Sequence, residues 1–250
     1  MKKIIISVLA AISLVGIAGC ATETAVLSEE KEYEVTQNIH SLDIEINAAD
    51  FAIEQGDEFS VVSNLKNLSV SEKDGILKIT DETKASAKYN NATLTLYVPE
   101  DIVFEDASII TGAGRLTADS LSTNTLSLKT GAGMVQFNSL NAYDSVDIKG
   151  GAGQINIDDG TLNNLSLNLG VGQLDMTTAL LGENDLQFGV GESDLTLIGS
   201  EDDYQFEIKN GIGAISIENK SAASFTSNTD GKSYVRVKGG IGATNIDFKE

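Results

Sequence analysis

The side chains that most often carry out chemistry in proteins are scarce in this 250-residue chain. It contains one cysteine, Cys20, one histidine, His40, and two arginines, Arg115 and Arg236. A single cysteine excludes an internal disulfide and a cysteine-based metal cluster. A single histidine leaves histidine-based catalysis and structural zinc without their usual residues. We therefore expect no metal and no cofactor, with His40 exposed at the entrance to the folded domain.

Carboxylates are the one reactive group present in excess. The chain has 37 Asp and Glu against 17 Lys and Arg, for a net charge of −20. Paired carboxylates are the catalytic groups of many polysaccharide-acting enzymes, and we expect Asp147, Asp158 and Asp175 to lie near one another on the outside of the fold. The two arginines and the lack of Trp give such an enzyme no sugar platform. We therefore predict no catalytic residues, and keep a polysaccharide-acting β-helix enzyme as the alternative.

The acidic excess also bears on ions and nucleic acids. The runs Asp158-Asp159 and Glu201-Asp202-Asp203 could hold Ca²⁺, but they lack the ordered spacing of an EF-hand loop or a Ca²⁺-binding β-roll. We interpret them as solvated surface. Binding of nucleic acid requires an excess of Lys and Arg to neutralise phosphates, so we exclude a nucleic-acid partner.

The first 20 residues have the pattern of an export leader. Lys2 and Lys3 precede an apolar run, Ile4 to Ile17, which is too short for a comfortable membrane span. The run ends in Ile17-Ala18-Gly19-Cys20, which resembles a bacterial lipobox. That resemblance implies residues 1–19 to be a lipoprotein signal peptide, with cleavage before Cys20 and diacylglycerol on its thiol.

Residues 20–37 are predicted to be the lipid-attached flexible spacer that follows this leader. They contain five glutamates and no apolar periodicity, which indicates an extended, self-repelling segment. Two or more acyl chains on one residue give stable anchoring. We therefore expect an exported, membrane-anchored lipoprotein that faces outside the cytoplasm, at the cell surface or in the periplasm, with the membrane as a partner through Cys20.

A short glycine corner recurs through the rest of the chain. Its first glycines are 19, 20, 19, 19, 22 and 29 residues apart, which is the signature of a stacked repeat. GxG can also bind phosphate, but only before a helix, and here alternating apolar residues follow each pair. We interpret the pairs as structural corners: Gly112 and Gly114, Gly131 and Gly133, Gly151 and Gly153, Gly170 and Gly172, Gly189 and Gly191, Gly211 and Gly213, Gly240 and Gly242.

Apolar residues recur at fixed offsets from each first glycine. Around Gly131 they are Leu126 and Leu128 before the corner, and Val135 and Phe137 after it. These offsets are odd before the corner and even after it, and a straight strand cannot change parity without turning its side chains to the other face. The glycines must therefore bend the chain. The residue between the two glycines is also apolar, and grows from Ala through Val to Ile.

These patterns predict an all-β fold. We favour a parallel β-solenoid of coils of about 19–20 residues, because near-identical residues then lie next to one another in consecutive coils. Each copy would be a strand, a corner, a second strand and a polar connection. A stacked antiparallel β-sandwich is the alternative.

The β-repeat domain is expected to span residues 38–250. Alternation from Leu42 to Ile53 indicates a degenerate first copy, in which Asn47 supplies the left-handed tendency of glycine. A hairpin-containing region follows at 57–98, with Asp74-Gly75 as its turn. We expect loops at Lys84–Asn91 and Glu218–Lys232.

The run Leu94 to Asp101, followed by Ile109 to Gly114 and its repeats, resembles the bacterial "putative adhesin" repeat domain, which is related to head-GIN adhesin-like and Lia-type cell-envelope-stress proteins. The resemblance covers roughly residues 38–250. It implies a β-solenoid or stacked β-sheet protein at the cell envelope. We expect a non-enzymatic, lipid-anchored surface protein, an adhesin-like binding or scaffold module for an unidentified envelope protein or glycan, with a link to the envelope stress response.

Overall fold

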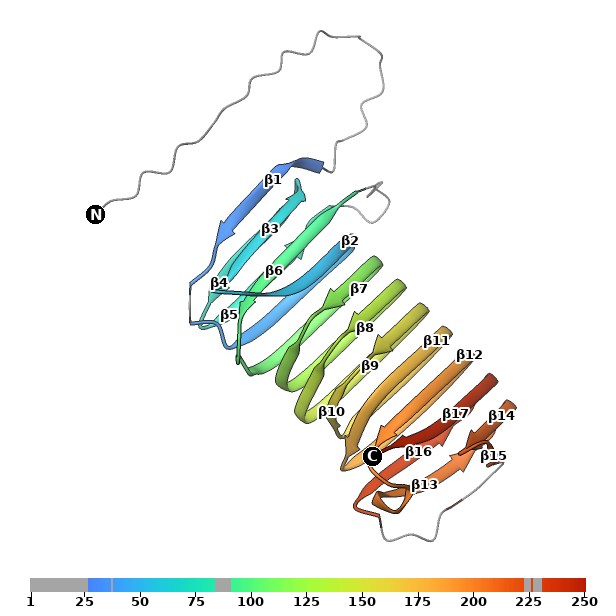
Figure 1. Cartoon of the computed structure of the whole chain (residues 1–250). Helices are drawn as coiled ribbons and strands as arrows, with labels where there is room; N and C mark the ends of the chain where they lie inside the picture. Colours follow the sequence, from blue (N-terminus) through green and yellow to red (C-terminus); the bar gives the residue numbers. More distant parts are fainter. Residues whose placement is uncertain (1–26, 37, 84–90, 223–225, 227–230) are drawn as a thin grey trace, which may run out of the picture.

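The computed structural model describes residues 27–36, 38–83, 91–222, 226 and 231–250, and in these the chain forms one long stack of β-strands (Figure 1). The only helical element in this part is a single turn, η1 (Glu201–Asp203). None of the described segments is a helix long and apolar enough to span a bilayer. The predicted signal peptide and Cys20 lie outside the described residues.

Five long strands form the middle of the stack, and each runs through a glycine corner. They pair in parallel and in register, so that Ile109, Leu128 and Ile148 lie side by side in successive coils. This confirms the parallel solenoid over the antiparallel sandwich. The five strands are β7 (Phe104–Ala118), β8 (Leu121–Phe137), β9 (Leu140–Ile157), β11 (Leu165–Leu181) and β12 (Glu183–Ile198).

The corner divides each coil into two faces. We call the strand segments before the corners the first face and those after them the second face. In all seven copies the positions three and five residues before the first glycine, and four and six after it, are buried. Leu128 and Phe137 are fully enclosed. A large apolar side chain contributes about 1.5–3 kcal/mol when it is buried in this way, and the repeats share one continuous core.

A third, short face closes the middle coils, where the sequence predicted only a polar connection. Here β10 (Gly160–Asn163) pairs in parallel with the start of β9 and the end of β11. Leu121, Leu140, Leu162 and Leu180 are buried on this face. The prediction missed it because runs of three or four residues are too short to show periodicity.

The N-terminal end of the stack begins with β2 (Ser41–Gly56), which is the degenerate first copy. Its register against β7 pairs Leu42 with Ala107 and Ala48 with Ala113. The expected role of Asn47 is wrong, because its backbone is not left-handed. Its side-chain amide instead donates to the carbonyl oxygens of Asp81, at 3.0 Å, and Thr83, at 2.6 Å.

Four shorter strands cover the outer side of β2. The predicted hairpin is present, with Asp74 and Gly75 both at positive φ in its turn. In space, β5 and β6 each pair in parallel with one half of β2, and β3 and β4 pair antiparallel with β6 and β5. The strands are β3 (Ser60–Leu65), β4 (Leu68–Lys73), β5 (Ile76–Asp81) and β6 (Thr93–Pro99). Most of the predicted loop at 84–91 lies outside the described residues.

The outermost strand, β1 (Leu27–Glu34), corrects the predicted spacer. This segment pairs antiparallel with β3 instead of remaining extended in solvent. Backbone hydrogen bonds hold it, while Leu27 and Tyr33 pack against the core and its charged side chains remain exposed. Such charges are how edge strands avoid pairing with other molecules, so the absence of apolar periodicity did not mean the absence of a strand.

The last two copies stack out of sequence order. In the stack, β16 and β17 lie directly against β12, and β13 and β14 lie outside them (Figure 1). Stacking in chain order was therefore a wrong expectation. Both copies carry the same inward pattern, so the pattern cannot decide their order. The strands are β13 (Tyr204–Lys209), β14 (Ile212–Ile217), β15 (Lys220–Ser221), β16 (Ser233–Lys238) and β17 (Ile241–Lys249).

The expected loop at Glu218–Lys232 joins β14 to the inserted coil. Its beginning, β15, folds back antiparallel onto β14. Residues 223–225 and 227–230 lie outside the described residues.

Candidate interaction surface along the glycine corners

The corners form a column in which backbone lies directly on backbone. A Cβ on Gly131 would lie 2.3 Å from the carbonyl oxygen of Gly112 in the next coil. Gly133 has a φ of +142°, and a Cβ there would lie 2.0 Å from the oxygen of Gly114. All fourteen predicted corner glycines make such an approach, at 2.4 Å or less. The first glycine is thus required by space alone, and the second mostly by space and backbone conformation together.

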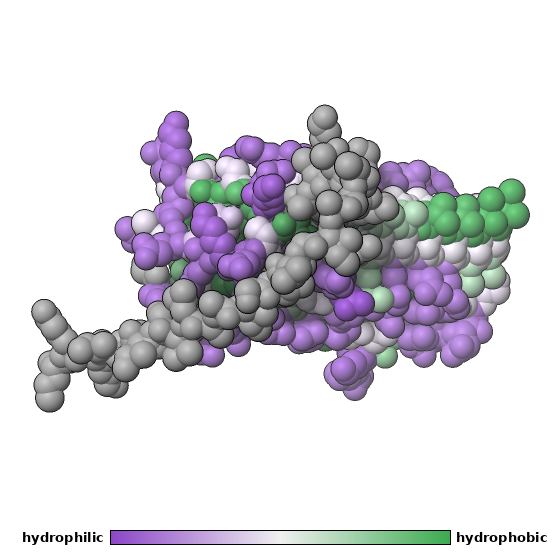
Figure 2. Space-filling model, turned by 90° about the horizontal axis from the view of Figure 1, so that it is seen from above, coloured by the Kyte–Doolittle hydropathy of each residue, from purple (hydrophilic) through white to green (hydrophobic). Residues whose placement is uncertain are grey.

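The residue between each pair of glycines points out of the fold. Together these residues form a line of apolar side chains along one edge of the stack, which we call the corner ridge. In stack order it consists of Ala113, Ala132, Ala152, Val171, Val190, Ile241 and Ile212. Val171, Val190, Ile241 and Ile212 are 57%, 45%, 51% and 78% exposed. Figure 2 shows a hydrophobic band on one edge of the molecule, against otherwise largely polar surface.

Positive charge gathers beside this ridge in a strongly acidic protein. Within the six residues from two before to three after each first glycine, the seven copies hold five basic residues and one acidic residue, Glu192. The local charge is therefore +4 (5 − 1), against −20 for the whole chain. The five bases are Arg115, Lys129, Lys149, Lys209 and Lys238.

Three of these lysines also have carboxylate partners on the first face. Lys149 lies 2.6 Å from Asp147, Lys209 2.5 Å from Glu207, and Lys238 3.4 Å from Asp185. The side chains of these lysines are nevertheless 56%, 63% and 41% exposed. Their ammonium groups therefore remain available to a further anionic group at the edge.

A shallow groove runs beside the ridge on the second face. Its floor is corner glycine backbone, and its walls include Arg115, Met134 and Gln154. The sequence pattern showed that the residue between the glycines is apolar, but no prediction was made of whether it is buried or exposed. The parity of the pattern predicts exposure for this residue. It lies one residue after the first glycine, an odd offset, whereas the buried rows after the corner have even offsets.

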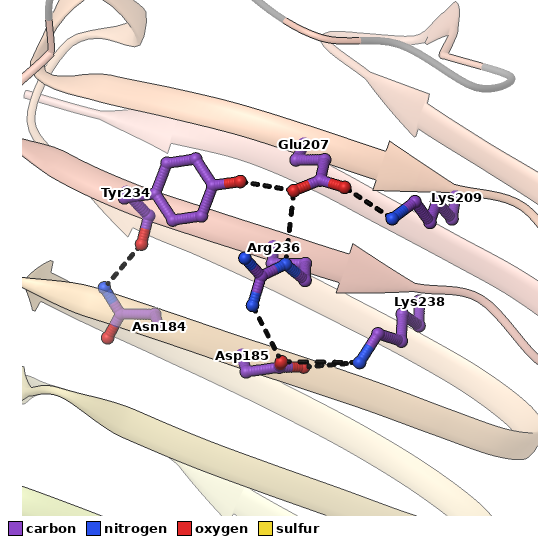
Figure 3. A network of polar contacts seen from close by, with 7 residues as sticks. All are labelled: Asn184, Asp185, Glu207, Lys209, Tyr234, Arg236 and Lys238. Carbon is purple, nitrogen blue, oxygen red and sulfur yellow. Dashed lines mark hydrogen bonds and ion pairs between the residues drawn. The ribbon is translucent and has the colours of Figure 1, made fainter.

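A second polar feature lies on the first face, where Arg236 of the inserted strand β16 bridges both neighbouring strands (Figure 3). Its guanidinium lies 3.2 Å from Asp185 in β12 and 3.2 Å from Glu207 in β13. Tyr234 donates its hydroxyl to Glu207 as well. Hydrogen bonds from Lys209, Tyr234 and Arg236 lower the pKa of Glu207 to about 2. This cluster fastens the inserted coil to both of its neighbours.

Below this cluster, Asn184 is the polar exception in a buried row. It is 2% exposed. Its amide nitrogen donates to the carbonyl oxygen of Tyr234 at 3.1 Å, and its oxygen accepts from the backbone N–H of Leu165 at 3.0 Å. A buried amide with partners in both adjacent strands fixes the position of the inserted coil.

Of the three carboxylates expected to lie together, Asp147 is separated from the other two. Asp147 is on the first face, beside Lys149, whereas Asp175 is on the second face in register with Asn156 and Asp194. Asp158 follows the end of β9. The expected cluster of three is therefore wrong, because the corner turns Asp147 to a different side from Asp158 and Asp175.

The acidic runs take ordinary structural positions in the described part of the chain. The carboxylate of Asp203 accepts hydrogen bonds from the N–H and hydroxyl of Ser200, which lower its pKa. Across the described ranges no three His, Cys, Asp or Glu side chains are placed to hold a metal ion. His40 is exposed, as predicted, and its Nδ1 lies 3.2 Å from Glu105.

A separate groove lies where the end of β2 meets the third face. Its lining includes Glu54, Asp101 and the ring of Tyr143, together with Ser120 and Ser122. Tyr143 is exposed. We call it the Tyr143 groove. It combines an aromatic ring with carboxylates and hydroxyls, which are groups that hydrogen-bond and stack against sugars.

Comparison with solved structures returned several proteins whose match covers most of this chain. A "putative adhesin" from Parabacteroides distasonis is 16% identical, with a TM-score of 0.47, and the match covers 91% of this chain and 98% of that one. A "putative cell adhesion protein" from Clostridium sporogenes is 13% identical, with a TM-score of 0.42, and the match covers 88% and 99%. A search of curated proteins found no match. The family profile described as Toastrack DUF4097 matches residues 39–238, and the chain therefore belongs to the Toastrack family.

Proposed function

We propose that this chain is a non-enzymatic, lipid-anchored surface protein of the cell envelope, and that it acts as an adhesin-like binding or scaffold module. The observation that carries this proposal is the build of the stack. Its interior is filled by apolar side chains, and polar side chains on its outer rows hydrogen-bond between neighbouring strands. On the second face, Asn156 donates to Gln136 at 2.9 Å, and Asn245 donates to Asp194 at 2.8 Å. Repeat proteins use such extended faces to bind partners.

The anchoring half of the proposal is supported by the leader pattern that ends in Cys20. It is tested by expressing the full chain with a clickable fatty acid in the medium, alongside the Cys20→Ser variant. Incorporation of lipid into the wild type, and its loss in the variant, is the expected result. An unmodified Cys20 in the mature protein would refute the anchor without affecting the binding role.

The binding half is tested with a fragment of residues 21–250. This fragment contains every described strand and the whole described core, so it keeps the fold of the full chain. We expect it to retain one envelope protein or one glycan from an envelope extract. Retention that is the same on a fragment unfolded before coupling would count against a specific partner.

The Tyr143 groove favours glycan binding as a second candidate function. A sugar could stack on the ring while Glu54 and Asp101 accept hydrogen bonds from its hydroxyls. Both carboxylates are exposed, whereas the acid of a glycoside hydrolase needs a setting that keeps it protonated. We expect Tyr143→Ala to weaken binding to envelope glycans. Hydrolysis of a glycan that is lost in Glu54→Gln would instead support the enzyme.

We also propose that the protein is linked to the envelope stress response. This link is supported by the resemblance of the chain to the putative-adhesin repeat domain, to which Lia-type and head-GIN proteins are related. Deletion of the gene should change the response of an envelope-stress reporter to cell-wall antibiotics. An unchanged response would remove this part of the proposal.

A further inference from the structure

We propose that the corner ridge, with its flanking basic residues, is a membrane contact, and that the stack lies lengthwise along a bilayer that carries anionic headgroups. This inference rests on the proposed anchoring of the chain at Cys20. It assigns the orientation of the anchored molecule and the surface that meets the lipid.

The first support is the chemistry of the edge. Val171, Val190, Ile241 and Ile212 are apolar side chains left in solvent at consecutive rungs of the stack. Five bases flank the ridge, in a chain whose net charge is −20. Aliphatic groups that enter the headgroup region, with lysines reaching anionic phosphates beside them, are the elements of an interfacial contact.

The second support is the point at which the chain enters the stack. Leu27 pairs with Leu65 in β3. When the β3–β6 register is continued for two residues and the β6–β2 register for one, Leu65 lies level with Ala49 of β2. Ala49 pairs with Gly114, the second glycine of a corner. The chain therefore enters the fold on the same edge as the corner ridge, and not on the opposite side.

The third support is reach. Cys20 precedes Leu27 by seven residues (27 − 20), which span at most about 25 Å when fully extended. On the second face β1 is the first strand, β11 the eighth and β14 the eleventh. At about 4.8 Å per strand, the apolar end of the ridge lies roughly 34–48 Å from β1 along the edge. Lipid at one end and the ridge at the other would hold the molecule flat.

A bilayer fits this edge better than a second copy of the chain does. The exposed aliphatic part of the ridge is one residue wide and four residues long, whereas a stable protein interface uses about 20–30 residues from each side. A weak contact is sufficient for a molecule already tethered nearby, because the tether makes the second contact intramolecular.

The test uses two features of the sequence, a single Cys and no Trp. Fragment 20–250 is coupled through Cys20 to a maleimide lipid in phosphatidylcholine vesicles that contain phosphatidylglycerol and brominated lipid. The reporter variant is Val190→Trp on the ridge, and the matched control is Asp175→Trp on the second face. We expect a blue shift and loss of emission for the Val190→Trp variant only, and less loss when Lys209 and Lys238 are also replaced by Gln.

Equal emission from the two variants would overturn the proposal. So would equal quenching in vesicles of phosphatidylcholine alone, because the bases would then contribute nothing. If Val190→Trp is not quenched and the uncoupled fragment sediments as a dimer that Ile241→Asp dissociates, the ridge is an interface between copies. Because the chemical coupling replaces natural lipidation, an unmodified Cys20 in cells would refute the anchor and leave the vesicle result readable.

Discussion

The middle of the stack and its C-terminal end are built from the same repeat but held by different means. In β7 to β12, each coil lies against its neighbours in chain order, and uncharged hydrogen bonds such as that from Asn156 to Gln136 add to the apolar rows and glycine corners. At the C-terminal end the order is exchanged, and a charged cluster around Arg236 and a buried amide, Asn184, bind the inserted coil to both neighbours. Residues that recur in every copy thus fix the cross-section of a coil, whereas residues present in one copy only, such as Arg236 and Asn184, fix where a coil lies in the stack.

The largest effect is expected from adding a side chain to a middle corner. Gly153→Val should prevent folding, because its Cβ would lie 1.9 Å from the carbonyl oxygen of Gly133, at a φ of +151°. The control is Gly150→Ala, whose Cβ meets only side-chain atoms of Leu169, Ile155 and Thr130. Circular dichroism and protease resistance should be lost in the first variant and retained in the second.

A core truncation in a middle coil should cost less than a filled corner. Phe137 is fully buried on the second face, and Phe137→Ala should lower the free energy of unfolding by about 3–5 kcal/mol. Urea unfolding gives this value. A loss below about 1 kcal/mol would mean that the middle coils are not closely packed.

Removal of the buried amide tests whether the inserted coil is fixed by a polar pin. Asn184→Ala leaves the N–H of Leu165 without its partner, and should cost about 1–3 kcal/mol. Hydrogen exchange should increase in β16 before it increases in β8. Uniform acceleration in both strands would contradict a local role for Asn184.

The smallest effect is expected from acid. The pKa of Glu207 is held at about 2, below its ordinary value of 4.5. Its contribution to stability is therefore complete above pH 4.5 and is lost as the pH falls toward 2. Hydrogen exchange in β13 and β16 should rise over this window, and Glu207→Gln should abolish the dependence. An unchanged profile in that variant would show that other carboxylates are responsible.

How far the sequence predicted this fold depended on how often a signal recurs. Rows such as Ile109, Leu128 and Ile148 repeat in every copy, so strand direction, corner and core could be predicted. The strand at Leu27–Glu34 could not be predicted, because backbone hydrogen bonds hold it and these leave no pattern in the side chains. The third face could not be predicted either, because its strands are too short to show periodicity. Arg236 lies between Asp185 and Glu207, which are 51 and 29 residues away from it in the sequence, and no local pattern predicts contacts over such separations.

The surface was the least predictable part. Asp147 and Asp175 are equivalent in the sequence pattern as outward carboxylates, and only the bend at the corner separates them. The basic residues beside the ridge are spread over more than a hundred residues of sequence, from Arg115 to Lys238, and become one edge only in the stack. By contrast, the scarcity of Cys, His and Arg and the lack of Trp could be read directly from the sequence.

The displaced coil makes the closing of the stack depend on residues that come after β14 in the chain. The slot between β12 and β13–β14 is filled by residues 233–249, which follow both neighbours in the chain and are therefore synthesised after them. Until they are in place, the strand edges of β12 and of the β13–β14 coil that border this slot lack the partners they have in the structure. A chain that stops before residue 233 would therefore leave β12, β13 and β14 without their shared partner strands, whereas a chain that includes residues 233–249 pairs all of them.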